Sequence, residues 1–183
     1  MRKGDRVELD IADTNNLGCG IARCEGKVVF VKGAVTGDTV RAQVIKDNKS
    51  YCVARLEQIV KPSEHRIEQS VCDAPLSCGG CVYRHVRYDY EKQLKQEYVK
   101  NCFEREGLHN VTVLPTCQTD RTLGYRNKGQ YPVSRRGGKT VYGFYASKTH
   151  DVIPCNSCAI QNPTFAPICR EICSLCDKLG IGV

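Results

Sequence analysis

A cysteine-rich loop limits how the middle of this chain can fold. It contains Cys72-x5-Cys78-Gly79-Gly80-Cys81, three thiols within ten residues around a glycine pair that lets the backbone wrap tightly. The stretch 64–84 around it shows little apolar periodicity, so a hydrophobic core is a poor explanation for its shape. We therefore expect a bound metal to organise this loop.

The identity of the metal depends on a fourth ligand from elsewhere in the chain. Iron–sulfur clusters are held by cysteine thiolates, usually four per cluster, and Cys158 is the candidate partner of the three loop cysteines. Zinc is the alternative, because Cys78-x2-Cys81 and Cys155-x2-Cys158 would supply two CxxC knuckles. The iron–sulfur assignment uses Cys72 as a ligand, and the zinc assignment uses Cys155 in its place. An anaerobic preparation that is brown would indicate the iron–sulfur cluster, and a colourless one would indicate zinc.

A second cysteine group, Cys169-x3-Cys173-x2-Cys176, has the spacing of the radical S-adenosylmethionine cluster motif. These cysteines also stand at helical spacing, beside the apolar residues Ile168, Ile172, Leu175 and Leu179. Helical spacing of this kind predicts an amphipathic stripe packed in a core. We therefore interpret this group as part of a helix, since a motif without its structural context is a weak signal.

Residues 1–60 alternate apolar and polar positions in short runs separated by glycines. The runs at 7–11, 28–31 and 40–44 are typical strands, Gly37-Asp38 marks a turn, and Lys61-Pro62-Ser63 ends the pattern. Such a sequence favours a small, strongly bent antiparallel barrel. We predict a five-stranded OB-like barrel in this segment.

The rest of the chain mixes helical and strand patterns. A helix is expected over 89–106, with Asp89 as its N-cap and Gly107 as its stop. A hairpin is expected over 125–145 around Arg135-Arg136-Gly137-Gly138, and a last helix from Pro163 or Thr164 to Leu179. The predicted fold is mainly β with α, divided into a barrel (1–60), a metal loop (61–88), a helix (89–107) and an incomplete α+β central domain (108–183).

The charge balance points to a polyanionic partner. There are 27 Lys and Arg against 20 Asp and Glu, a net charge of +7, which favours binding of nucleic acid. Base stacking on aromatic rings and phosphate contacts by cations single out six RNA-binding candidates: Tyr125, Arg126, Lys128, Lys32, Arg135 and Arg136. No apolar run could span a bilayer and the N-terminus has no signal-peptide core, so we expect a cytoplasmic protein without membrane contact.

These features together resemble the bacterial 23S ribosomal RNA uracil-5-methyltransferases. Gly18-x-Gly20-Ile21-Ala22 and the segment 29–40 resemble a TRAM domain, a small RNA-binding barrel. The loop Cys72-x5-Cys78-Gly79-Gly80-Cys81 resembles the family's cluster loop. Tyr125-Arg126-Asn127-Lys128, 143–145 and 158–161 resemble the central domain, and the order and spacing of the pieces make the resemblance specific.

The resemblance implies a 4Fe-4S cluster held by Cys72, Cys78, Cys81 and Cys158. In this assignment Cys155 is not a ligand. It implies a monomeric enzyme that methylates a flipped-out uridine of 23S ribosomal RNA with S-adenosylmethionine. We find no glycine-rich turn for that cofactor and no catalytic residue, so the S-adenosylmethionine site is expected outside this chain, which should be inactive by itself.

Two alternatives remain at the level of sequence. One is a non-enzymatic RNA-binding module stabilised by zinc or an iron–sulfur cluster. The other is a radical methylthiotransferase-like protein, a class that also carries TRAM domains but usually at the other end of the chain. The sequence downstream of residue 183 would distinguish the first alternative from a methyltransferase.

Overall fold

A computed structural model describes all residues of the chain except 73, 76 and 183. The chain forms two compact units. The barrel unit comprises Met1–Gln69 and Val82–Gln118, and the cysteine unit comprises Ser70–Cys81 and Thr119–Val183. The expected metal loop 61–88 is thus shared between the two units, and its three cysteines all belong to the cysteine unit.

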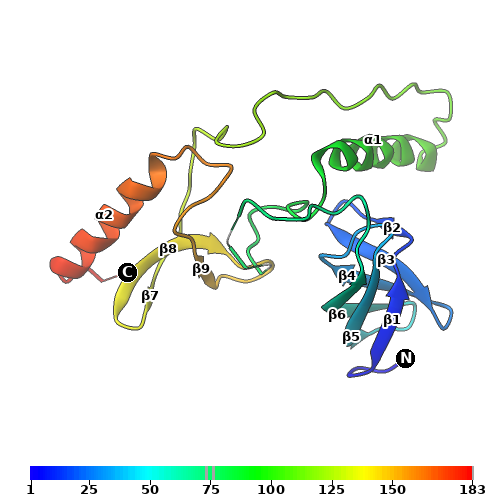
Figure 1. Cartoon of the computed structure of the whole chain (residues 1–183), viewed down its shortest axis with the longest axis horizontal. Helices are drawn as coiled ribbons and strands as arrows, with labels where there is room; N and C mark the ends of the chain where they lie inside the picture. Colours follow the sequence, from blue (N-terminus) through cyan, green and yellow to red (C-terminus); the bar gives the residue numbers. More distant parts are fainter. Residues whose placement is uncertain (73, 76, 183) are drawn as a thin grey trace. The chain divides into compact units, whose positions relative to one another are not determined.

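The barrel unit is built on one curled sheet (Figure 1). Its strands are β1 (Arg6–Asp10), β2 (Asp13–Thr14), β3 (Cys19–Cys24), β4 (Lys27–Lys32), β5 (Thr39–Asp47) and β6 (Tyr51–Lys61), in the order β1-β5-β6-β4-β3-β2. Only the β4–β6 pair is parallel. Three register shifts along β5 bend it against β6, which allows the sheet to curl. The predicted barrel is therefore confirmed, with the short strand β2 in addition to the five expected.

Alternation along the strands divides core from surface. On β4, Val29 and Val31 are fully buried, whereas Phe30 between them and Lys32 after them face outward. The other members of the core follow the same rule: Leu9, Ile11, Ala22, Ala34, Val40, Ala42, Val44, Cys52 and Ala54. Burial of these side chains from the whole length of residues 1–60 stabilises the sheet.

The expected turn at Gly37-Asp38 carries a buried carboxylate. Gly37 has a positive φ of 86°, and Asp38 is 1% exposed. The Asp38 carboxylate accepts hydrogen bonds from the backbone N–H groups of Val35 (2.7 Å) and Ser63 (2.8 Å) and forms a two-pronged ion pair with Arg66. It therefore ties the β4–β5 connection to the segment after β6.

Helix α1 (Tyr88–Arg105) agrees with the predicted helix to within one residue at each end. The N-cap is Arg87, so the prediction of Asp89 was wrong, and Asp89 instead lies in the first turn, where its charge favours the helix dipole. Gly107 ends the helix as predicted, with a φ of 76° and a hydrogen bond from Leu108 N–H to the Phe103 carbonyl (2.9 Å). On its apolar side, only Leu94 is buried.

The cysteine unit contains a three-stranded antiparallel sheet and one helix. Strands β7 (Val133–Arg136), β8 (Lys139–Tyr145) and β9 (Val152–Pro154) lie in sequence order, and α2 (Phe165–Lys178) packs on β8. Gly137 and Gly138 both have positive φ, which confirms the predicted tight turn. The hairpin begins only at Val133, because Arg126, upstream of it, pairs with Gln161 instead of with β8.

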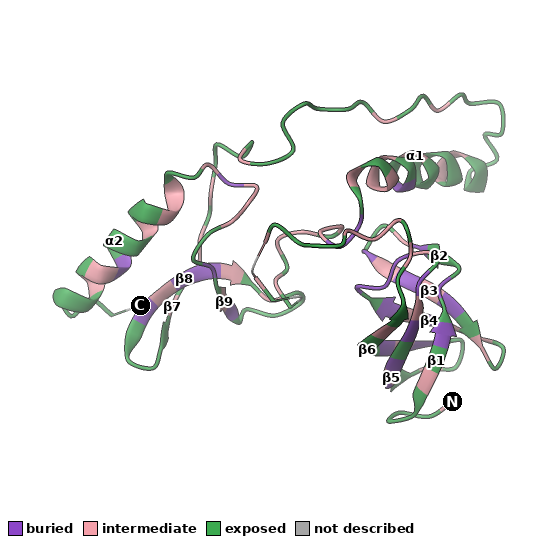
Figure 2. Ribbon diagram, in the orientation of Figure 1, coloured by how far each residue is buried: buried purple, intermediate pink, exposed green. Residues whose placement is uncertain are grey.

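The apolar stripe of α2 is not buried, contrary to the sequence prediction. Ile168, Ile172, Leu175 and Leu179 are 55%, 52%, 45% and 70% exposed. Cys173 is the buried residue of this helix, and Figure 2 shows one buried band between exposed and intermediate segments of α2. The sheet of this unit is only three strands wide, so it covers one narrow face of the helix. Neither helix among the described residues combines the length and the apolar character needed to cross a bilayer.

Candidate functional site

The glycine pair of the cysteine loop lets the loop pair with the segment that follows β8. Gly79 N–H donates to the Tyr145 carbonyl (3.0 Å), Ser147 N–H donates to the Ser77 carbonyl (3.1 Å), and Cys78 forms a β-bridge with Ala146. A Cβ atom on Gly79 would lie 2.8 Å from the Tyr145 carbonyl oxygen. Any other residue at this position would therefore push the loop away from its partner strand.

Cys158 lies in a tight turn that stabilises its thiolate form. Contact with the Cys155 thiol, which donates to the Ser157 carbonyl (2.9 Å), and with the backbone N–H groups of Ile160 and Gln161 lowers the pKa of Cys158 to about 6 in spite of burial. The same contact with Cys158, together with burial, raises the pKa of the Cys155 thiol. At neutral pH, Cys158 is therefore a thiolate, the form that binds metals, and Cys155 is a protonated donor.

The loop cysteines and Cys158 are close enough that charge on the others affects the pKa of Cys81. Burial raises the pKa of Cys81, and negative charge at Cys158, Cys72 and Cys78 raises it further, while Arg126 opposes them. The structure thus places the four predicted ligands in one compact unit. Among the residues that the structure describes, no three or more Cys, His, Asp or Glu side chains are arranged so that they could hold a metal ion.

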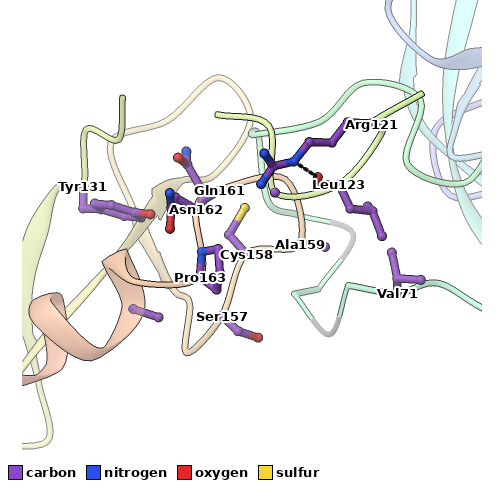
Figure 3. Close-up of a pocket in the computed structure, with 12 residues that line it drawn as sticks. Val71, Arg121, Leu123, Tyr131, Ser157, Cys158, Ala159, Gln161, Asn162 and Pro163 are labelled. Carbon is purple, nitrogen blue, oxygen red and sulfur yellow. Dashed lines mark hydrogen bonds between the residues drawn. The ribbon is translucent and has the colours of Figure 1, made fainter. Parts of the chain in front are cut away.

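A cavity of about 440 Å³ opens beside Cys158 (Figure 3). Its lining comprises Val71, Arg121, Leu123, Gly124, Tyr131, Ser157, Cys158, Ala159, Gln161, Asn162, Pro163 and Ala166. Gln161 is 4% exposed, and its side-chain oxygen Oε1 has no hydrogen-bond partner among the described residues. Sequence reasoning missed Arg121 and Gln161, because nothing local marks either residue as part of a pocket.

The RNA-binding candidates of the cysteine unit lie on two segments. Tyr125, Arg126 and Lys128 are exposed on the segment before β7, not on a strand as expected. Arg135 and Arg136 are at the β7–β8 turn, where Arg135 also lies 3.7 Å from the Asp177 carboxylate. These five side chains therefore offer cations and one aromatic ring to solvent.

Lys32 lies on the outer face of β3, β4 and β6 in the barrel unit. The strand register places it beside Arg55 of β6, and the rings of Phe30 and Tyr51 meet edge to face at 5.8 Å on the same face. Among the described residues, neither Lys32 nor Arg55 has a carboxylate partner. By contrast, Arg41 on β5 is paired with Glu8 on β1 at 3.2 Å. This face thus presents uncompensated positive charge next to aromatic rings.

Comparison with known proteins agrees with the barrel assignment and extends it. The TRAM domain family matches residues 2–56, the curled sheet. An uncharacterized RNA methyltransferase of Halalkalibacterium halodurans is 35% identical over 182 residues, which cover 99% of this chain and 40% of that protein. An uncharacterized RNA methyltransferase of Clostridium acetobutylicum is 36% identical over 165 residues, covering 88% of this chain and 36% of that protein.

A solved structure shares the fold over nearly the whole chain. The tRNA (uracil-54, C5)-methyltransferase of Pyrococcus abyssi, in complex with S-adenosyl-L-homocysteine, matches with a TM-score of 0.68 over 96% of this chain and 38% of that one, at 20% identity. The chain thus contains a TRAM domain followed by elements that share the fold of the corresponding part of that structure. The chain is similar over most of its length to these RNA methyltransferases, and it spans about two fifths of the length of the relatives named above.

Proposed function

We propose that this chain is the RNA-binding and cluster-binding part of an S-adenosylmethionine-dependent RNA uracil-5-methyltransferase whose substrate is 23S ribosomal RNA. The observation that carries the proposal is the gathering of Cys72, Cys78, Cys81 and Cys158 in one unit, with Cys158 held as a thiolate. The similarity to named RNA methyltransferases supports the reaction class. The uracil specificity and the ribosomal substrate rest on the resemblance of the sequence motifs.

The chemistry of the cysteines fits an iron–sulfur cluster. Thiolates are its usual ligands, and nearby backbone N–H groups stabilise them, as those of Ile160 and Gln161 help to lower the pKa of Cys158. Burial and the negative charge of the neighbouring thiols raise the pKa of Cys81, a repulsion that a cationic iron centre would remove. Cys155 serves as a hydrogen-bond donor in this proposal, not as a ligand. When bound, the cluster would cross-link the cysteine loop to the Cys158 turn.

RNA binding is assigned to solvent-facing cations and rings of both units. In the barrel unit these are Lys32 and Arg55 beside Phe30 and Tyr51. In the cysteine unit they are Tyr125, Arg126, Lys128, Arg135 and Arg136. The cations provide phosphate contacts and the rings provide stacking surfaces, the combination that single-stranded RNA requires.

The cluster assignment is tested by metal analysis of oxygen-free protein. We expect about four iron and four sulfide per chain and a brown colour, and the Cys72→Ser and Cys158→Ser variants should lose the iron. Cys155→Ser is the matched control, because it removes a buried thiol from the same turn, and it should keep the iron. Stoichiometric zinc, or iron retained by the Cys158→Ser variant, would contradict the assignment.

The RNA assignment is tested by filter-binding titrations of the whole chain at several salt concentrations. Transcripts of 23S ribosomal RNA loops should bind more tightly than a transfer RNA transcript of equal length. The reverse order would contradict a ribosomal substrate. Equal, weak binding of both transcripts with no salt dependence would contradict RNA binding by this chain.

A further inference from the structure

We propose that the cavity beside Cys158 binds one unpaired nucleobase, with the adjoining phosphate held by Arg121. This inference rests on the proposed RNA-binding function and deepens it, because it assigns a base-reading site to the cysteine unit. The volume of about 440 Å³ lies within the roughly 300–1,000 Å³ typical of small-molecule sites. Figure 3 shows the labelled side chains of Tyr131, Gln161 and Arg121 around it.

The walls of the cavity are braced by backbone hydrogen bonds, so the site is preformed. Gly124 N–H donates to the Ala159 carbonyl (2.8 Å), Arg126 N–H to the Ile160 carbonyl (3.0 Å), and Asn162 N–H to the Arg126 carbonyl (3.0 Å). Two segments far apart in the sequence are thereby fixed side by side. A ligand that enters the cavity does not have to order them, which removes part of the entropic cost of binding.

Gln161 is the residue that points to a ligand. Its carboxamide is buried at 4% exposure, and Oε1 is an acceptor without a partner among the described residues. Burying a polar group without a hydrogen bond costs free energy, so a ligand that donates a hydrogen bond to this acceptor would bind favourably. The edge of a nucleobase supplies ring or exocyclic N–H donors together with acceptors. A carboxamide, which carries one acceptor and two donor hydrogens, is complementary to such an edge.

Tyr131 and Arg121 provide the other two parts of nucleotide recognition. Tyr131 lines the cavity, its ring is held by contacts with the rings of Tyr142 (5.6 Å) and Phe144 (5.3 Å), and it supplies the aromatic wall that a base requires. The Nε of Arg121 donates to the Leu123 carbonyl (3.3 Å), which fixes an otherwise exposed guanidinium at the rim. Gly124 makes room for it, because a Cβ there would lie 3.3 Å from Arg121 Nη2.

A nucleobase could come from RNA or from the adenosine of S-adenosylmethionine. The charge at the rim favours RNA, because a guanidinium attracts a phosphodiester and repels the sulfonium of the methyl donor. Among the described lining residues there is no Asp or Glu to accept ribose hydroxyls or to balance a sulfonium. The two sources are separated in the test below.

The test compares two RNA dodecamers that carry equal charge, one of uridines and one with every base removed. The oxygen-free chain should bind the uridine dodecamer at least about tenfold more tightly than the abasic one. Gln161→Leu should reduce the affinity for the uridine dodecamer about tenfold and leave the abasic dodecamer unchanged. Gln130→Leu is the matched control, because Gln130 is exposed on a neighbouring segment, and it should behave as the original chain. If circular dichroism shows that Gln161→Leu does not fold, Gln161→Met is used in its place.

Each other result has one meaning. If the chain binds neither dodecamer, the RNA-binding function itself fails, and this inference fails with it. If the chain binds but Gln161→Leu has no effect, or affects both dodecamers equally, only the base site is overturned. Competition by S-adenosylmethionine that the Gln161 variant abolishes would assign the cavity to the methyl donor. Loss of iron from this variant would assign the cavity to the cluster. Both of these results overturn the proposal.

Discussion

Replacing Asp38 with alanine should unfold the barrel more readily than any surface change. Its carboxylate is 1% exposed and accepts hydrogen bonds from two backbone N–H groups and from Arg66, whose side chain is 13% exposed. Removing it leaves these donors without their acceptor and one buried cation without its partner. Breaking a buried pair from one side costs roughly 3–5 kcal/mol. We therefore expect a loss of about 3–5 kcal/mol in the free energy of unfolding of this unit.

The measurement should report on the barrel unit alone, because the chain has two units. Native-state hydrogen exchange of the fully buried Val29 and Val31 amides on β4 does so. The matched control is Glu8→Ala, which breaks the exposed Glu8–Arg41 pair and should cost less than about 1 kcal/mol. A loss below about 1 kcal/mol for Asp38→Ala would refute the reasoning that the buried ion pair ties the β4–β5 connection to the segment after β6.

Three further predictions concern pH, packing and RNA. Burial lowers the pKa of His85 from 6.5 to about 4, so the unfolded chain binds more protons than the folded chain between these pH values. The free energy of unfolding of the barrel unit should therefore fall by about 3 kcal/mol as the pH falls from 6.5 to 4. Urea titrations should show no such loss for a correctly folded His85→Gln variant. Gly143→Ala should prevent folding of the cysteine unit, because its Cβ would lie 1.8 Å from the Ile153 carbonyl oxygen, and a native circular dichroism spectrum would contradict this. Lys32→Ala should reduce by about one the slope of the logarithm of the RNA-binding constant against the logarithm of salt concentration. Arg41→Ala removes a cation that is already paired with Glu8, so it should leave this slope unchanged. Equal slopes for both variants would argue against the outer face of β4 as an RNA contact.

Much of the local structure could be predicted from the sequence, because the signals are carried by neighbouring residues. The alternation on β4, the glycine turn at Gly137-Gly138 and the helix stop at Gly107 all depend on the backbone and side-chain preferences of a few consecutive positions. The N-cap of α1 was misassigned by two residues, since Arg87 takes the capping position without a side-chain hydrogen bond. End positions of helices are set by small energy differences that the sequence leaves open.

Of the candidate site, the sequence singled out only the cysteines, whose role as ligands stays a prediction. Spacing and the glycine pair singled out Cys72, Cys78 and Cys81, and the chemistry of clusters called for Cys158. Gln161 and Arg121 carried no such signal, since a buried amide and a rim cation become recognisable only when two distant segments meet. The expected strand around Arg126 was wrong for a related reason, as Arg126 pairs with Gln161 instead of with the hairpin.

The sequence by itself determined the curled sheet, the two helices, the tight turns and the set of thiols available to a metal. Tertiary structure alone decided that the apolar stripe of α2 lies exposed, that the pKa of Cys158 is lowered beside Cys155, and that a cavity opens next to Cys158. The physical reason is range. Strand alternation, helix periodicity and turn geometry are properties of adjacent residues. Burial, the pKa of a thiol and the shape of a pocket depend instead on which segments of the chain come into contact.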